Sequence, residues 1–230
     1  MIGDAGIGRL LSRGPLLLDF DGPVASIFGG YPAPTIAEQL RRLVEREGVS
    51  VADKARHETD PMEVLRWTST LGNEKLTRKV EDALCRAEMI AVETAIPDRY
   101  GHAVITKARE IGKPVAIVSN NSAGAIVTYL AAHNLTQCIA FVAGRAYAEP
   151  TLMKPNPEPI LRAANALNAP SASCTLVGDS LFDIEGARAA QMPVIAYANK
   201  APKVQRFMDA KADIVITSMA DIVDALAGLA

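Results

Sequence analysis

The sequence has 230 residues, enough for one substantial domain or for a core domain that carries a smaller insertion. Hydrophobic residues make up 49% and charged residues 22% of the chain, a balance typical of a globular protein and not of a disordered one. With 24 basic and 26 acidic side chains and a formal net charge of −2, the chain has no basic surplus that would favour nucleic acid or an acidic membrane as a partner.

The cysteines and the N-terminus indicate the compartment. Cys85, Cys138 and Cys174 are far apart and odd in number, which fits neither a disulfide framework nor a metal-binding motif. Residues 1–13 lack an apolar run of signal-peptide length, and no segment approaches the roughly 20 apolar residues of a membrane helix. We therefore expect an unexported protein in the reducing cytoplasm, with no membrane partner.

The first predicted strand is the apolar run at residues 16–18. It leads into Asp19 and then into the turn-forming pair Asp21 and Gly22. Such a run is typical of a strand that is buried on both faces and stops at a tight turn. Both aspartates are therefore expected at the carboxyl end of this strand.

Helical patterns dominate from residue 24 to residue 96, and no convincing strand is expected there. The residues at 35–38 match a capping box, which predicts the start of a first helix. Asp60, followed by proline, is expected to open a second helix, and Asn73 to cap a third. This segment is expected to form a helical unit.

After residue 97 strands and helices alternate regularly. Strands are expected near residues 115–118, 139–142, 174–177, 194–196 and 214–216, with a helix between each pair. Such alternation argues for a parallel sheet with helices on both faces. The predicted fold is therefore an α/β, Rossmann-like parallel sheet core of residues 1–23 and 97–230, with an inserted α-helical cap domain of residues 24–96.

Polar residues follow several of these strands. Besides the two aspartates after the first strand, these residues are Ser119, Asn120 and Asn121 after the second, Lys154 after the third, and Asp179 and Asp183 after the fourth. Singly, each has a plain structural explanation as a turn, a loop or a helix cap. Because parallel strands place their carboxyl ends at one edge of the sheet, together they predict a site.

The same residues carry a resemblance to a known family. Asp19-Phe20-Asp21-Gly22 resembles the first motif of the haloacid dehalogenase superfamily, Ser119 the second, Lys154 the third, and the Gly-Asp-Ser-Leu-Phe-Asp sequence at 178–183 the fourth. Their order and spacing match over nearly the whole chain. The insertion after the first motif is similar to that of the helical-cap phosphatase branch.

The resemblance implies a phosphohydrolase that acts on a small phosphorylated metabolite through an aspartyl-phosphate intermediate. Asp19 would be the nucleophile, and Asp21 would protonate the leaving oxygen and then activate water. Ser119 and the backbone N–H of Asn120 would bind the phosphoryl group. Lys154 would neutralise phosphoryl charge and hold the nucleophile.

The resemblance also implies a Mg²⁺ ion. Its ligands would be Asp19, the backbone carbonyl of Asp21, and Asp179, with Asp183 supporting the site directly or through water. Carboxylates this close together resist ionisation unless a cation lies among them, and Mg²⁺ favours oxygen ligands.

One position departs from the family pattern. Pro23 stands where the family commonly has threonine, which removes a side-chain hydrogen bond and one backbone donor at the edge of the motif. We expect this change to affect rate and not the class of reaction.

Three other functions stay open on this scaffold. A haloacid-type dehalogenase is disfavoured by Asp21, because halide needs no protonation. A phosphomutase fits the same motifs, and a non-catalytic binding protein is disfavoured by the complete set of motif residues. Two further groups are interpreted as structural or solvated; they are His57, His102 and His133, and the cap residues Arg66, Trp67, Lys75 and Arg78.

Overall fold

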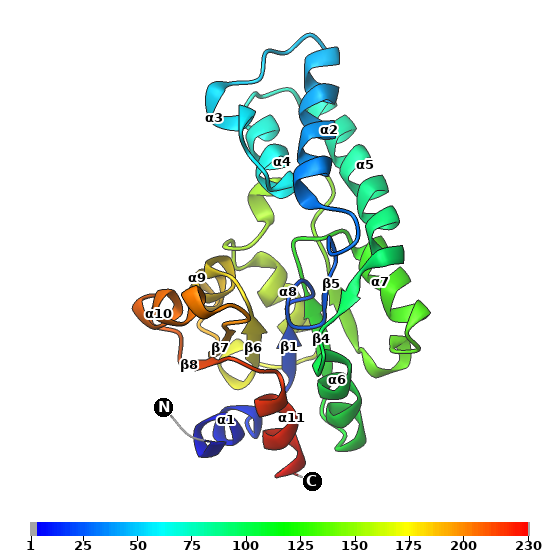
Figure 1. Cartoon of the computed structure of the whole chain (residues 1–230). Coiled ribbons are helices and arrows are strands. Elements are labelled where there is room, and N and C mark those ends of the chain that lie inside the picture. Colours follow the sequence, from blue (N-terminus) through cyan, green and yellow to red (C-terminus); the bar gives the residue numbers. More distant parts are fainter. Residues whose placement is uncertain (1–3, 230) are drawn as a thin grey trace.

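In the computed structural model, which describes residues 4–229, six parallel strands form one sheet in the order β5-β4-β1-β6-β7-β8 (Figure 1). The strands are β1 (Leu16–Leu18), β4 (Val115–Val118), β5 (Phe141–Ala143), β6 (Thr175–Gly178), β7 (Val194–Tyr197) and β8 (Ile214–Ile216). β1 pairs in parallel with β4 on one side and with β6 on the other. The predicted Rossmann-like α/β fold is confirmed.

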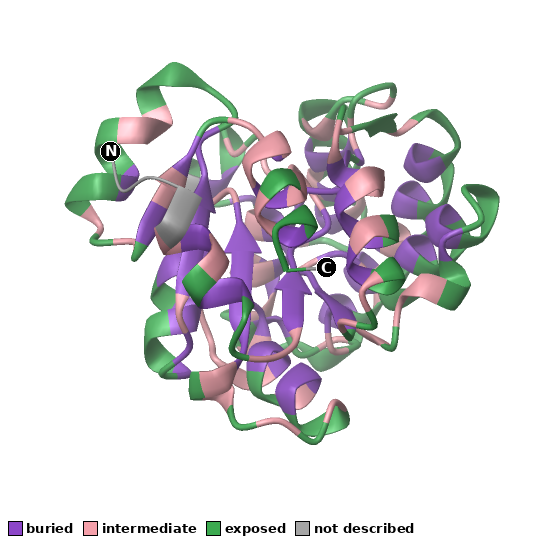
Figure 2. Ribbon diagram, turned by 90° about the horizontal axis from the view of Figure 1, so that it is seen from below, coloured by how far each residue is buried: buried purple, intermediate pink, exposed green. Residues whose placement is uncertain are grey.

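Helices cover both faces of the sheet. One face carries α1 (Asp4–Leu11), α6 (Gly101–Glu110), α7 (Ala123–Ala132) and α11 (Ala220–Ala227). The other carries α8 (Glu158–Ala166), α9 (Leu181–Ala189) and α10 (Ala201–Asp209). Side chains alternate along a strand, so Leu16 and Leu18 join the first layer of core and Leu17 the second. The strands between these layers are buried throughout most of their length (Figure 2).

A helical segment lies beyond the sheet, between β1 and β4 in the chain. It comprises α2 (Ala33–Arg46), α3 (Asp53–Arg56), α4 (Pro61–Ser69) and α5 (Glu74–Ala91) (Figure 1, upper part). These helices share an apolar core of their own, which includes Leu40, Leu65, Val80 and Leu84. The domain boundaries at residues 24 and 96 stay a prediction.

Two of the predicted helix starts are confirmed. The Asp60 carboxylate accepts a hydrogen bond from the Met62 N–H at 2.8 Å, at the start of α4. The Asn73 side-chain oxygen accepts one from the Leu76 N–H at 3.0 Å, at the start of α5. Each cap satisfies a backbone donor that the first turn of a helix leaves without a partner.

Other details of the prediction were wrong. The capping box expected at 35–38 does not form, because α2 already begins at Ala33 and has no side-chain cap. Pro34 lies in its first turn, where the missing N–H and the fixed φ of proline favour a helix start. Two short strands, β2 (Ala25–Ser26) and β3 (Ile96–Pro97), pair antiparallel where no strand was expected. With two residues each, they are too short to show an alternating pattern.

The described helices are those of a globular fold. α5 has 18 residues and carries charged side chains along much of its length. Within residues 4–229, no helix combines the length and the apolar character that crossing a bilayer requires.

Candidate active site

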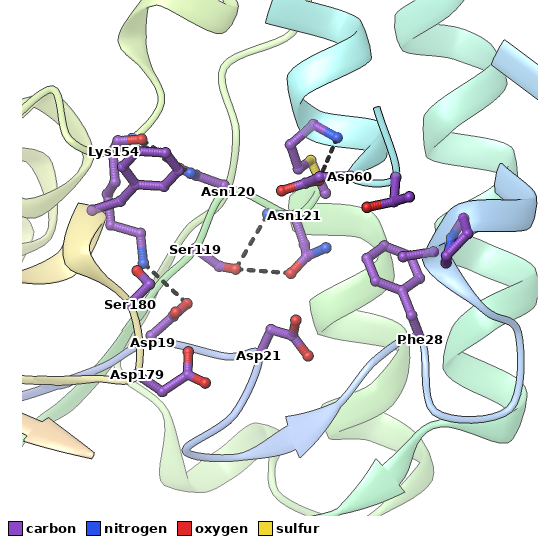
Figure 3. Close-up of a pocket in the computed structure, with 15 residues that line it drawn as sticks. Asp19, Asp21, Phe28, Asp60, Ser119, Asn120, Asn121, Lys154, Asp179 and Ser180 are labelled. Carbon is purple, nitrogen blue, oxygen red and sulfur yellow. Dashed lines mark hydrogen bonds and ion pairs between the residues drawn. The ribbon is translucent and has the colours of Figure 1, made fainter. Parts of the chain in front are cut away.

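The predicted polar residues meet at the carboxyl edge of the sheet. The chain runs from β1 to β4 and β5 on one side and then returns to β6, β7 and β8 on the other, so β1 lies at a switch point where such sheets bind ligands. A cavity of about 390 Å³ opens there, and its lining includes Asp19, Asp21, Ser119, Lys154 and Asp179 (Figure 3). This volume suits a small molecule.

Lys154 holds two of the acids together. Its ammonium lies 3.0 Å from Asp19 Oδ1 and 2.6 Å from Asp183 Oδ1, and donates to the Val118 carbonyl at 2.9 Å. Only 2% of the residue is exposed. Burial alone would lower the pKa of Lys154, but Asp183 and Asp19 raise it above its ordinary value. The three donors of a charged ammonium are thus all used within the site.

Asp19 is buried beside these charges. Its Oδ1 also accepts a hydrogen bond from the Phe20 N–H at 2.6 Å. Burial and the nearby carboxylates of Asp183 and Asp179 raise the pKa of Asp19 well above its ordinary value, although Lys154 acts in the opposite direction. A further cation would therefore stabilise the ionised form of this group.

Asp183 is fully buried, and both of its oxygens are engaged. Oδ1 binds Lys154, while Oδ2 accepts from the Ser180 N–H at 3.0 Å and from the Ser180 hydroxyl at 2.6 Å. The Ser180 contacts form a capping box that starts α9. Gly178 makes room for this arrangement, because a Cβ there would lie 2.6 Å from Asp183 Oδ2.

Asp179 follows β6 and faces the same cavity. Its Oδ2 accepts from the Lys203 ammonium at 2.6 Å and from the Asn199 amide at 2.9 Å. Burial raises the pKa of Asp179, and Lys203 partly opposes that shift. Gly22 has a φ of +100°, and a Cβ there would lie 2.7 Å from Asp179 Oδ2. Only glycine therefore fits the first motif at this place without displacing the acid.

The donor set fits a divalent metal ion. Asp19, Asp179 and Asp183 each offer a carboxylate oxygen, and these atoms all lie within 4.8 Å of one another. Burial raises the pKa of Asp19 and of Asp179 despite Lys154 and Lys203, so a nearby cation would favour their ionised forms. Hard oxygen ligands of this kind suit Mg²⁺, which completes its octahedron with water.

Asp21 lies apart from this cluster, on the wall of the cavity. Its Oδ1 accepts from the Ile27 N–H at 2.9 Å. Burial raises the pKa of Asp21 to about 6, and the nearby charges of Asp179 and Asp60 act in the same direction. A carboxyl group with such a pKa can both give and take a proton near neutral pH.

The loop after β4 is held by its own side chains. The Ser119 hydroxyl donates to Asn121 Oδ1 at 3.0 Å and accepts from the Asn121 N–H at 3.2 Å. The Asn120 side chain bridges to the backbone of Lys154, accepting from its N–H at 2.8 Å and donating to its carbonyl at 3.1 Å. The Asn120 side chain thus connects Lys154 to the loop that carries Ser119, whereas the sequence predicted a role only for the backbone of Asn120.

A buried ionic network supports this loop from behind. Arg145, in the segment after β5, pairs with Glu88 at 2.7 Å and with Glu81 at 2.7 Å, both on α5. It also donates to the Asn120 carbonyl at 2.7 Å, and Glu88 accepts from the Asn121 amide at 3.3 Å. Helix α5 of the helical segment is therefore tied directly to the loop that carries Ser119.

The helical segment closes the cavity on the far side. Its lining residues there are Phe28, Ala33, Pro34, Thr59, Asp60 and Met62. Arg66, interpreted from sequence as a solvated residue, instead contacts the core, where it donates to the Pro150 carbonyl at 3.1 Å and to the Lys154 carbonyl. Lys75 and Arg78 are both exposed on α5, and Trp67 packs against the helical core.

Sequence reasoning missed Asn199, Lys203, Asp60 and the Arg145 network. Asn199 follows the end of β7, so its place after a strand was a usable signal. Lys203, Asp60 and Arg145 carried no such signal, since an isolated charge on a helix or loop is usually solvated. Among the histidines, His102 hydrogen-bonds Tyr129 at 2.8 Å and its ring lies tilted, 4.9 Å from that of His133; none of the three histidines lines the cavity.

Fold and site together define a family. The chain belongs to the haloacid dehalogenase-like hydrolase family, whose sequence pattern matches residues 34–197. The match includes the second, third and fourth motifs and begins after Asp19 and Asp21. The resemblance inferred from the motifs is confirmed.

Curated relatives match over part of their length. A segment of 87 residues is 41% identical to the plasmid-encoded phosphoglycolate phosphatase of Cupriavidus necator, covering 37% of this chain and 36% of that protein. A segment of 74 residues is 39% identical to the pyrophosphatase PpaX of Halalkalibacterium halodurans, covering 31% and 34%. The chain thus matches about a third of the length of these relatives.

Solved structures match over almost the whole chain. A hydrolase from Pseudomonas syringae has a TM-score of 0.68 at 16% identity, and the match covers 94% of this chain and 99% of the hydrolase chain. A β-phosphoglucomutase from Clostridium difficile has a TM-score of 0.64 at 16% identity, covering 94% and 97%. At these identities the likeness shows the fold alone, and a hydrolase and a mutase share it.

Proposed function

We propose that this chain is a Mg²⁺-dependent phosphohydrolase that cleaves small phosphate monoesters through an aspartyl phosphate on Asp19. The observation that carries the proposal is the place of Asp19 in the cavity, fixed by Lys154 and facing Asp21 and Ser119. The names of the curated relatives, a phosphoglycolate phosphatase and a pyrophosphatase, support the phosphohydrolase class.

Asp19 is the proposed nucleophile. Lys154 and the Phe20 N–H both bind Oδ1, so we assign the attack on phosphorus to Oδ2. The new bond joins Oδ2 to phosphorus, and the bond from phosphorus to the ester oxygen breaks. Asp21 in its protonated form gives its proton to that oxygen, which leaves as an alcohol.

Hydrolysis of the intermediate uses the same carboxyl group. Asp21, now ionised, takes a proton from a water molecule, whose oxygen attacks phosphorus. The bond between phosphorus and Asp19 Oδ2 breaks, releasing inorganic phosphate and restoring both carboxyl groups. A pKa of about 6 for Asp21 suits both steps, because neither protonation state is strongly disfavoured near neutral pH.

The phosphoryl oxygens need donors throughout. Ser119 and the backbone N–H of Asn120 are the proposed hydrogen-bond donors. The Lys154 ammonium already has Asp19, Asp183 and Val118 as partners, so its main proposed role is to hold the nucleophile and offset charge.

The proposed Mg²⁺ ligands are Asp19, the backbone carbonyl of Asp21, and Asp179. Asp183 has both oxygens engaged, which favours its acting through a water molecule. When bound, the ion would offset the negative charge of the acids and of the phosphoryl group.

The proposed setting is the cytoplasm, with a small phosphorylated metabolite as partner and neither nucleic acid nor membrane. The odd number and the wide spacing of the three cysteines support this setting.

Phosphate release from p-nitrophenyl phosphate and from a panel of phosphorylated metabolites tests the proposal. The purified chain should release phosphate with Mg²⁺ and not with a chelator, and Asp19→Asn should be inactive with an unchanged unfolding midpoint. Activity of Asp19→Asn near that of the parent would remove Asp19 as nucleophile. Transfer of phosphate between two hydroxyls of one sugar phosphate, without net release, would favour a mutase.

A further inference from the structure

The cavity offers no cation to the part of a substrate that leaves. Among the described residues that line it, Lys154 is the only one with a positive charge. Its ammonium is already bound by Asp19, Asp183 and the Val118 carbonyl, at the bottom of the cavity. Among the described lining residues, a leaving alcohol on the side of the helical segment therefore has no basic side chain to pair with.

One basic residue of the helical segment, Arg66, has partners of its own outside the cavity lining. Arg66 pairs with Glu63 at 2.9 Å and donates to the carbonyls of Pro150 and Lys154. Its guanidinium also lies 5.4 Å from the centre of the Phe182 ring, and this ring, unlike Arg66, lines the cavity. Arg66 thus joins the two parts of the molecule and does not itself line the cavity, although its charge acts on Asp60.

Asp60 lines the cavity on the side of the helical segment. Its carboxylate projects from the start of α4 toward the cavity, across from Asp21 (Figure 3). The Met62 N–H donates to Oδ1 at 2.8 Å. Burial raises the pKa of Asp60, and hydrogen bonds from the Met62 and Glu63 N–H groups and the charge of Arg66 oppose that shift. The charge of Asp60 contributes to the raised pKa of Asp21, so the two carboxyl groups are within electrostatic reach of each other.

The remaining lining on this side is apolar or neutral. Phe28, Pro34 and Met62 contribute hydrocarbon surface, and Thr59 a hydroxyl group. A carboxylate or a second phosphate placed here would meet a like charge at Asp60, and none of the described lining residues on this side is basic. A hydroxyl or ammonium group would instead donate a hydrogen bond to Asp60.

We infer that the alcohol portion of the substrate carries no negative charge and donates a hydrogen bond to Asp60 through a hydroxyl or ammonium group. The inference rests on the proposed function and narrows its substrate class. Asp60 would repel an anionic substrate and attract one that donates a hydrogen bond. Both effects increase selectivity, because selectivity is the difference between two binding free energies.

Three two-carbon esters that differ in one group test the inference. They are 2-aminoethyl phosphate, 2-hydroxyethyl phosphate and 2-phosphoglycolate, which end in an ammonium, a hydroxyl and a carboxylate. For each, kcat/KM is measured by phosphate release at one pH and saturating Mg²⁺. The inhibition constant of each against p-nitrophenyl phosphate hydrolysis is a second readout, so a compound that is bound but slowly cleaved is still ranked.

In the parent, the ammonium and hydroxyl esters should exceed the carboxylate ester by at least about tenfold in kcat/KM or in affinity. Asp60→Asn keeps a good helix cap and removes the charge, so the fold should be retained. In this variant the three esters should differ less from one another in kcat/KM and affinity. Both quantities should rise for the carboxylate ester and fall for the ammonium ester. Asp53→Asn makes the same chemical change at an exposed position of α3, and should keep the ranking of the parent.

Preference of the parent for 2-phosphoglycolate would overturn the inference. An unchanged ranking in a folded Asp60→Asn would also overturn it, and would leave Asp60 as a helix cap only. The proposed function fails separately: a folded parent that releases phosphate neither from p-nitrophenyl phosphate nor from any ester of the metabolite panel with Mg²⁺ would disprove the hydrolase and with it the substrate class. Hydrolysis of p-nitrophenyl phosphate with the carboxylate ester ranked first would disprove the substrate class alone.

Discussion

Arg145 and Glu88 form an ion pair at 2.7 Å in which neither side chain is exposed to solvent. Arg145 belongs to the segment after β5 and Glu88 to α5, so the pair joins the sheet to the helical segment. Because Arg145 also binds Glu81 and the Asn120 carbonyl, one guanidinium holds together three parts of the chain. The loop that carries Ser119 is thus braced by charges that water does not screen.

Arg145→Ala should destabilise the fold strongly. The substitution leaves Glu81 and Glu88 buried without their positive partner, and breaking a buried ion pair in this way costs about 3–5 kcal/mol. The free energy of unfolding in urea measures the loss. Arg42→Ala is the control, because Arg42 and its partner Glu38 are exposed and such pairs contribute less than about 1 kcal/mol. Equal losses in the two variants would contradict a structural role for the buried network.

The main effect of Gly22→Ala should be a higher Mg²⁺ requirement for phosphate release, with a smaller effect on the free energy of unfolding. Alanine at a φ of +100° is strained, and its Cβ would also push against the Asp179 carboxylate. Gly48 has a φ of +81° with open space around it, so Gly48→Ala carries backbone strain alone. We expect both variants to lose about 1 kcal/mol or more of stability.

The two glycine variants should differ in their Mg²⁺ requirement. Only Gly22→Ala should raise the Mg²⁺ concentration for half-maximal phosphate release, by at least about tenfold. Titration of Mg²⁺ against phosphate release, beside urea unfolding, separates the two effects. The same half-maximal concentration in Gly22→Ala and Gly48→Ala would show that Asp179 does not depend on the space at Gly22.

The cysteines should differ in their reaction with iodoacetamide at pH 8. Burial raises the pKa of Cys85 to about 12, against the pull of Arg145, and burial also raises the pKa of Cys174. Only the thiolate reacts, and its fraction at Cys85 is about 10⁻⁴ at that pH. Mass spectrometry should therefore find Cys138 labelled first in the folded protein, and all three labelled in denaturant. Rapid labelling of Cys85 in the native state would contradict the buried network around it.

The sequence predicted the sheet well because buried parallel strands and their polar ends leave a direct pattern. The run at residues 16–18 and Asp19 are adjacent in the chain, so the end of β1 was visible without any tertiary information. Helix starts were visible where a side chain caps its own backbone, as at Asp60 and Asn73. The start of α2 was predicted wrongly, because proline favours that start and no side-chain cap marks it.

Residues that act through distant partners were not predictable in the same way. Lys203 lies 24 positions after Asp179, and Arg145 lies 57 positions after Glu88. Nothing local distinguishes such charges from solvated ones, because their partners become neighbours only when the sheet and the helical segment are assembled. The same holds for Asp60, whose local role as a helix cap hides its place in the cavity wall.

Asp179→Asn tests the proposed metal site without relying on activity alone. Asparagine keeps an oxygen for Lys203 and Asn199, so the fold should survive, but one negative charge of the three-carboxylate cluster is lost. Mg²⁺ that binds the native state raises the unfolding midpoint by mass action. The midpoint of the parent should therefore rise with Mg²⁺, and that of the variant should need at least about tenfold more of the ion.

Asp209→Asn is the matched control, because it removes the charge of an exposed acid on α10 and should respond to Mg²⁺ as the parent does. Phosphate release should follow the same order of Mg²⁺ requirement as the unfolding midpoints. An unaltered Mg²⁺ response in Asp179→Asn would remove this carboxylate from the ligand set. Since Asp183 has both oxygens engaged, the site would then retain only Asp19 as a direct carboxylate ligand, too few to hold the ion tightly.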